Sequence, residues 1–308
     1  MDSRPADSPG ETREHAPIAM PRKSTVERAD ADDADGIGSR LDSLVRRTGR
    51  VLLDRCPNFE AELRYVRSRY ADAYLRAAQF RYNRAHRAPI DPYRIYWVDP
   101  GRIVRLSAPS TVSRFRRLGT VADGDWDRFG VRFRDTDVFY GFRRHFEDGV
   151  PWDETAFFDR IVDEIDAGAE RWGCQSRAAF ERRCARLDRL YESIREHGFA
   201  SQRELVAADV DDPVAYRRET LSDRIINDEI AVDIGRDGDL LFADGRNRLA
   251  IAKVLDVDAV PVVVFRRHAQ WVAYRDAVAA FIRCGGAPAP AIRTHPDLAP
   301  LVDDEHGT

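Results

Sequence analysis

The sequence predicts a mixed α+β fold, and three observations carry that prediction. Two apolar runs, 230–234 and 240–243, flank a Gly-Arg-Asp-Gly turn whose glycines supply the positive φ angles of a tight hairpin. Apolar residues then recur at helical spacing over 249–255. The run 260–265 is apolar throughout, which is typical of a strand buried on both faces. The local order is therefore strand, turn, strand, helix and strand.

The N-terminal part of the chain predicts a tail and then helices. Residues 1–37 are rich in Asp, Glu, Ser, Pro and Ala without a periodic apolar face, so we expect them to be disordered. Apolar residues at helical spacing over 41–52 and 59–82 predict a helical extension over 38–90. Residues 38–118 carry 18 basic and 7 acidic side chains. Interleaved Arg and Tyr suit DNA or an anionic membrane surface, whereas the alternative is packed tyrosines and solvated arginines.

The main domain is expected over 91–284. A first strand is expected within 93–105, followed by a mostly helical insertion over about 111–185. Helices are predicted near 137–147, 154–166 and 177–198, and a final helix near Ala269. Residues 285–308, with Ala-Pro-Ala-Pro and a closing acidic run, predict a flexible tail.

The start of the predicted helix after 240–243 is the strongest candidate site. Asp244 is expected to be the N-cap, and Gly245 allows a sharp turn of the backbone. Arg246 and Arg248 stand in the first turn, where cations are unfavourable unless an anion binds there. The free amides of a helix N-terminus bind phosphate, so the pattern predicts a phosphate or polyphosphate site. The alternative is surface pairing of both arginines with neighbouring carboxylates.

A second candidate is the loop that contains Asp125 and Asp127. These two carboxylates flank a tryptophan and could hold Mg²⁺ against the phosphates of a nucleotide. The alternative is that both are turn residues bonded to their own backbone.

Three segments in order resemble the ParB/sulfiredoxin superfamily. Gly245-Arg246-Asn247-Arg248 followed by Leu-Ala-Ile-Ala-Lys resembles its Gly-x-x-Arg helix start. LDRLYESIREHGFASQREL, residues 187–205, resembles the helix that precedes the hairpin in ParB N-terminal domains, and YRIYWVDPGRIVR, residues 93–105, resembles their first strand. The chain is also similar to uncharacterised ParB-like proteins with Asp-Gly-x-x-Arg-Leu and a downstream Arg-His-x-x-Trp. The resemblance implies a ParB/sulfiredoxin-like mixed sheet with the nucleotide-phosphate loop at 245–248.

The departures from these families limit the activity that the resemblance implies. ParB proteins carry Gly-Glu-Arg-Arg, so Arg246 replaces a carboxylate tied to CTP hydrolysis. Sulfiredoxins carry Gly-Cys-His-Arg, so Arg246 also replaces the reactive cysteine, and sulfinic acid reduction is not expected. Resemblance to ParB CTPases and the related free-serine kinases implies binding of a nucleotide or other phosphorylated ligand, with phosphotransfer or slow hydrolysis. No nucleophile stands out in the sequence.

In this hypothesis Arg246 and Arg248 neutralise phosphates, while Asn247 and His268 select the ligand. Asp125 or Asp244 would hold Mg²⁺ or act as a base. His268 has a second interpretation, as a cap of the helix that begins near Ala269. The alternative function is a non-catalytic DNA-associated or regulatory module that uses the basic region 38–118.

The apolar runs and the cysteine spacing of the sequence predict a cytoplasmic location. No apolar run is long enough for a signal peptide or for the roughly 20 residues that cross a bilayer. The cysteines Cys56, Cys174, Cys184 and Cys284 form no Cys-x-x-Cys pair, which favours reduced thiols in the cytoplasm. A homodimer is compatible with the sequence.

Overall fold

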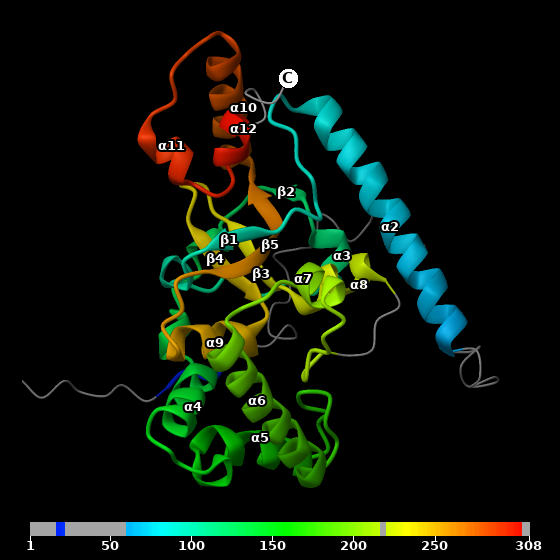
Figure 1. Ribbon diagram of the computed structural model, residues 1–308, viewed down its shortest axis with the longest axis vertical. Helices are drawn as coiled ribbons and strands as arrows, with labels where there is room; N and C mark the ends of the chain where they lie inside the picture. The colour runs from blue at the N-terminus through cyan, green and yellow to red at the C-terminus, as the bar shows by residue number, and fades with distance from the viewer. Residues whose placement is uncertain (1–16, 22–59, 216–219, 304–308) are drawn as a thin grey trace, which may run out of the picture.

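A computed structural model describes residues 17–21, 60–215 and 220–303. At its centre lies a mixed sheet of five strands (Figure 1). The strands are β1 (Tyr96–Val98), β2 (Thr120–Ala122), β3 (Ile230–Ile234), β4 (Leu240–Asp244) and β5 (Val260–His268). The predicted tail over 1–37, except 17–21, and the first predicted helix over 41–52 lie outside the described residues.

The long strand β5 organises the sheet. It pairs in parallel with β3 on one side, and β3 continues antiparallel to β4 through the predicted hairpin. On its other side β5 pairs antiparallel with β1 and in parallel with β2. Every residue of β5 is buried, which confirms the strand predicted from the apolar run over 260–265. The mixed α+β class is therefore confirmed.

The predicted helices of the middle and C-terminal regions are present, and several short elements were not predicted. The described helices are α2 (Glu60–Ala85), α3 (Arg114–Arg117), α4 (Asp137–Phe146), α5 (Ala156–Asp166), α6 (Arg177–His197), α7 (Gln202–Ala207), α8 (Leu221–Asp228), α9 (Arg246–Val254), α10 (Ala269–Arg283), α11 (Pro290–Thr294) and α12 (Ala299–Asp303). None of the helices in these described ranges is long and apolar enough to cross a membrane. Strand β2 lies inside the predicted helical insertion, so that range also contributes to the sheet.

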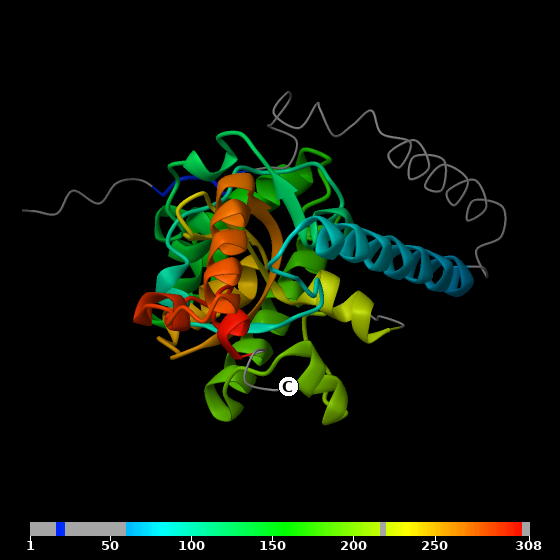
Figure 2. The ribbon, with the colours of Figure 1, turned by 90° about the horizontal axis from the view of Figure 1, so that it is seen from above.

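The helices surround the sheet on three sides. In Figure 1, α4, α5 and α6 lie below the sheet, α10 to α12 lie above it, and α2 runs along one flank. The view from above shows α2 as an outlying helix beside the body of the protein (Figure 2). One large hydrophobic core joins the sheet to the inserted helices, in which Phe133, Phe142, Phe158 and Phe180 are fully buried.

The C-terminal residues differ from the predicted flexible tail. Residues 290–303 form α11 and α12, and Leu298, Leu301 and Val302 are buried in the main core. Asp297 lies between these helices with 1% of its surface exposed and pairs with arginines of β5 and α10. Composition suggested a loose segment because Ala-Pro repeats lack periodicity, whereas a single buried carboxylate anchors the segment that follows them.

Candidate functional site

The candidate site begins where β4 ends and α9 begins. Gly245 has a φ of 92° and is the N-cap of α9, and no side chain in the described part of the chain caps the helix. The sequence predicts Asp244 in that role. The structure instead places Asp244 at the end of β4, where its Oδ1 accepts a hydrogen bond from the Gly245 amide at 2.9 Å. With no side-chain cap at α9, the amides of its first turn are available to a ligand.

Gly245 is required by both its conformation and its surroundings. A Cβ at this position would lie 2.8 Å from the Cα of Ile230, and a side chain at a φ of 92° is strained as well. We expect Gly245→Ala to lower the free energy of unfolding by about 2–3 kcal/mol. Gly168→Ala is the matched control, because Gly168 has a φ of 87° and no atom of the described residues lies within 4 Å of the added Cβ. Urea unfolding that shows equal losses for both variants would contradict this account.

Two cavities of about 370 Å³ each adjoin at the start of α9. Both are lined by Trp172, Asp244 and Arg246. The first lies between the sheet and the α5 region, and its lining includes Ser107, Ser110, Arg117, Glu164, Arg171 and Phe242. The second lies at the first turn of α9, and its charged lining consists of Arg114, Arg183, Arg246, Arg248, Asp212, Asp228 and Asp244. Four arginines against three aspartates give the described lining of the second cavity a net positive charge.

Arg246 is the cation that faces both cavities. Its guanidinium lies 4.6 Å from the centre of the Trp172 ring, a cation–π contact, and no carboxylate of the described residues forms an ion pair with it. Desolvation by burial lowers the pKa of Arg246. A partly desolvated cation of this kind is stabilised by any anion that enters the cavities.

The other residues of the predicted phosphate loop differ from Arg246. Arg248 and Asp244 have charged partners within the protein, and Asn247 has a buried polar atom. Arg248 is 5% exposed and forms an ion pair with Asp212. The Oδ2 atom of Asp244 accepts a hydrogen bond from Arg114 Nε at 2.8 Å. Asn247 lines the second cavity, and its Oδ1 is buried without a hydrogen-bond partner among the described residues. Pairing with a carboxylate, one of the alternatives from the sequence, therefore holds for Arg248 and not for Arg246.

His268 does not belong to this site. Ala231 of β3 is in register with Asp244 on one side and with Val263 on the other. Val263 therefore lies level with Asp244 across the sheet. His268 lies five residues further along β5, which is about 16 Å away at the rise of a strand. It is fully buried, its Nδ1 accepts from the Gln270 amide at 3.2 Å, and it caps α10. Its capping interpretation is confirmed, and its expected role in ligand selection is not supported.

Asp125 and Asp127 both accept hydrogen bonds from one arginine, Arg236. Arg236, in the β3–β4 turn, donates from Nη2 to both carboxylates at 2.7 Å and from Nε to Asp127 at 2.8 Å. This contact holds the pKa of Asp127 at about 2, with the Arg236 hydrogen bonds outweighing burial. Within the described residues, no group of three or more His, Cys, Asp or Glu side chains is arranged for a metal ion. The pairing with Arg236 does not support Mg²⁺ at these two carboxylates, and the Mg²⁺ site stays a prediction.

Sequence reasoning missed the residues that complete the cavities. Trp172, Arg114 and Asp212 come from segments far from α9 in the sequence, and none belongs to a motif. The one available signal was Trp172-Gly173 in a short connection between two predicted helices, where a large aromatic side chain would be unexpected on the surface. Comparisons with protein-family models, with curated proteins and with solved structures find no match.

Proposed function

We propose that this protein binds a small phosphorylated ligand, a nucleotide or another phosphate ester, at the first turn of α9. The observation that carries the proposal is the Arg246 guanidinium, which faces two adjoining cavities without a carboxylate partner among the described residues. The uncapped amides of the same turn add donors and a positive helix dipole. Phosphate ester oxygens are suited to both, because they accept several charge-assisted hydrogen bonds at once.

The size of the cavities supports a ligand larger than phosphate itself. Each holds about 370 Å³, within the range of sites for small molecules and cofactors. Phosphate at the α9 turn would place the rest of the ligand in the first cavity, beside Ser107 and Trp172. The resemblance to the ParB/sulfiredoxin superfamily supports the same phosphate-binding role for residues 245–248. Membership of that superfamily is itself a proposal, which rests on the three sequence motifs described above.

Phosphotransfer or slow hydrolysis would need a base beside the phosphate. Asp244 is a carboxylate that lines both cavities, and Arg114 holds its Oδ2 at 2.8 Å. Mg²⁺, where it takes part, would enter together with the phosphates of a nucleotide. Binding of a phosphorylated ligand is the primary proposal, and chemistry at Asp244 depends on it.

The test is a thermal-shift series with pyrophosphate, nucleoside mono- and triphosphates and sugar phosphates, with and without Mg²⁺. A ligand that binds the folded chain raises the midpoint of unfolding by mass action. We expect Arg246→Gln to weaken binding of the best ligand by about 10- to 100-fold, the effect of losing one hydrogen-bonding charge.

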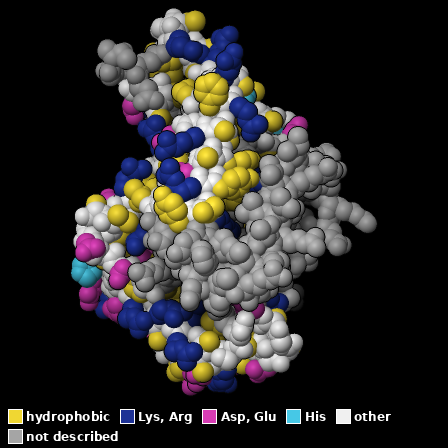
Figure 3. Space-filling model, turned by 90° about the vertical axis from the view of Figure 1, so that its right-hand side faces the viewer, with side chains coloured by type: hydrophobic (Ala, Val, Ile, Leu, Met, Phe, Trp, Pro, Cys, Tyr) yellow, Lys and Arg dark blue, Asp and Glu magenta, His cyan; other side chains and the backbone are white. Residues whose placement is uncertain are grey.

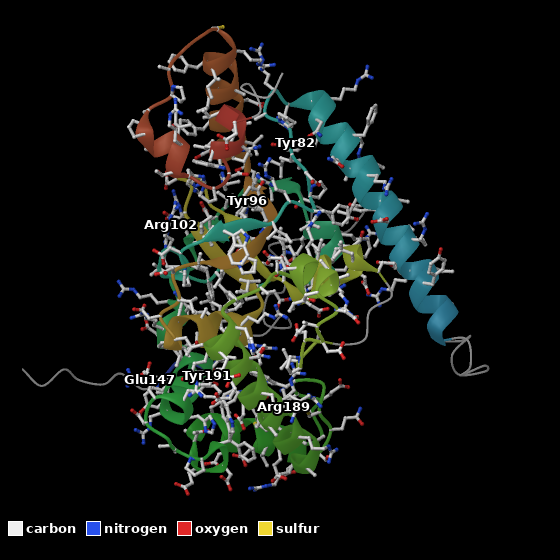
Figure 4. All side chains as sticks on the ribbon, in the orientation of Figure 1. Tyr82, Tyr96, Arg102, Glu147, Arg189 and Tyr191 are labelled. Atoms are coloured by element: carbon white, nitrogen blue, oxygen red, sulfur yellow. The ribbon has the colours of Figure 1, made fainter. Side chains whose placement is uncertain are left out.

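Arg189→Gln is the matched control, since it makes the same change on the exposed surface of α6 (Figure 4). Equal ligand shifts in the wild type and Arg246→Gln would overturn the proposal. Arg248→Ala is unsuitable as a test because it leaves Asp212 buried without its ion pair.

A further inference from the structure

The outward face of α2 carries a regular pattern of aromatic and arginine side chains. Tyr65, Arg69, Arg76, Phe80 and Arg84 follow one another at steps of four or seven residues, which places them on one side of a helix. We call this set the outer stripe. All five residues are exposed, Tyr65 with 54% and Phe80 with 67% of its surface accessible. Large exposed aromatic residues on a charged surface are a common mark of an interaction site.

The opposite face of α2 fixes the helix to the protein. Leu75 is fully buried, Ala71 is 7% exposed and Tyr82 is 8% exposed. Tyr70 and Tyr74 pack edge-on against Phe115 at 5.9 and 5.6 Å between ring centres. Packing therefore accounts for three of the tyrosines of this helix, and it does not account for the outer stripe.

The charge on this side of the molecule is strongly positive. From Tyr65 to Arg87 the sequence has six arginines and one aspartate, in a chain whose net charge is −4. That aspartate, Asp72, lies 3.8 Å from Arg76 and also accepts a hydrogen bond from Tyr93. Figure 3 faces this side of the molecule and shows Lys or Arg side chains beside hydrophobic ones. The surface is thus complementary to an extended polyanion.

We propose that the outer stripe binds a single-stranded nucleic acid, with its arginines on the phosphates and its aromatic rings stacked on bases. Single-strand binding sites combine these two features, and stacking needs no particular sequence. From Arg69 to Arg84 the helix rises about 22 Å. A stacked strand advances about 3.4 Å along its axis for each nucleotide, so the stripe matches about six nucleotides.

A membrane surface fits this pattern less well. Helices that lie on a membrane bury a continuous apolar face in the lipid. On α2 each aromatic side chain of the outer stripe is followed by an arginine, and the positions between them include the small residues Ala73 and Ala77. The alternation favours a polymer whose own charges and rings alternate.

The test is fluorescence anisotropy with a labelled 12-nucleotide oligo-dT strand and the full chain. Three phosphate contacts give a slope of about −2 for log K against log salt, so the affinity should fall about twentyfold between 50 and 200 mM salt. We expect Arg69→Gln/Arg76→Gln/Arg84→Gln to weaken binding at least tenfold at 50 mM and to bring the slope close to zero. Phe80→Ala is expected to weaken binding about tenfold, as the loss of one stacked base.

The matched control is Arg182→Gln/Arg189→Gln/Arg203→Gln, three exposed arginines of α6 and α7 with the same change of charge. This control variant should retain binding of oligo-dT to within about twofold of the wild type. Arg246→Gln should retain it as well, so a failure of the nucleic-acid proposal can be told apart from a failure of the proposed ligand site. Equal losses in both triple variants, or no salt-dependent binding by the wild type, would overturn the proposal. Binding to phosphatidylserine vesicles but not to oligo-dT would overturn it as well, in favour of a membrane.

Discussion

Replacing Asp297 by asparagine is expected to lower the free energy of unfolding by about 3–5 kcal/mol, the usual effect of breaking a buried ion pair. Asp297 is 1% exposed and accepts hydrogen bonds from Arg267 Nη2 at 2.6 Å and from Trp271 Nε1 at 2.8 Å. Arg275 Nε lies 3.0 Å from the same carboxylate. Both arginines are 2% exposed. Asparagine keeps the volume and one acceptor, but it leaves two buried guanidinium groups without a counter-charge.

The network reaches further than these three residues. Arg267 Nη2 donates to Tyr96 Oη at 3.4 Å and Arg275 Nη1 donates to Tyr82 Oη at 3.1 Å, and Figure 4 labels both tyrosines. It therefore connects β5, β1, α2 and α10 through one carboxylate near the C-terminus. We expect these four elements to unfold less cooperatively with one another in the Asp297→Asn variant.

Urea unfolding at pH 7 measures the effect. Asp303→Asn is the matched control, since Asp303 is the exposed residue at the end of α12. The arginines hold the pKa of Asp297 below its ordinary value, so its contribution is present above about pH 4 and is lost as the pH falls further. A loss in Asp297→Asn no greater than that in Asp303→Asn would show that the network does not stabilise the fold.

The sheet and most helices could be predicted because their signals are local. The hairpin over 230–244 and the strand β5 are marked by apolar residues and paired glycines, and the structure confirms both. The strand β2 was missed because three residues, Thr120–Ala122, carry too little pattern, and their pairing with β5 supplies the stabilisation. Tertiary context decides such short elements.

The candidate site was predicted only in part, for a different physical reason. The start of α9 carries a local signature, so Gly245 and Arg246 could be found in the sequence. Whether an arginine is free depends on carboxylates from distant segments, as Asp212 shows for Arg248. Arg236 neutralises Asp125 and Asp127 in the same way. Residue type and spacing suggest which groups can bind an ion, but long-range pairing decides which of them do.

Glu229→Gln is expected to remove a large dependence of stability on pH. Glu229 is 1% exposed, immediately before β3. Its Oε1 accepts a hydrogen bond from the backbone N–H of Gln202 at 2.5 Å, whereas its Oε2 has no hydrogen-bond partner among the described residues. Burial, together with the nearby charges of Asp228 and Glu204, raises the pKa of Glu229 to about 8. The folded chain therefore holds a proton at neutral pH that the unfolded chain releases.

The sign of the effect follows from this difference in bound protons. An unfolded glutamate titrates near 4.5 and the folded one at about 8, so the stabilisation is complete below pH 4.5 and is lost as the pH rises through 8. At about 1.4 kcal/mol for each pH unit, the change in unfolding free energy is about 4–5 kcal/mol. Glutamine is neutral at every pH and keeps the acceptor for Gln202, so Glu229→Gln should match the wild type at pH 5 and exceed its stability at pH 9.

Urea unfolding at pH 5, 7 and 9 tests this, with Glu196→Gln on the exposed surface of α6 as the matched control. Parallel pH profiles for the wild type and Glu229→Gln would contradict a protonated Glu229.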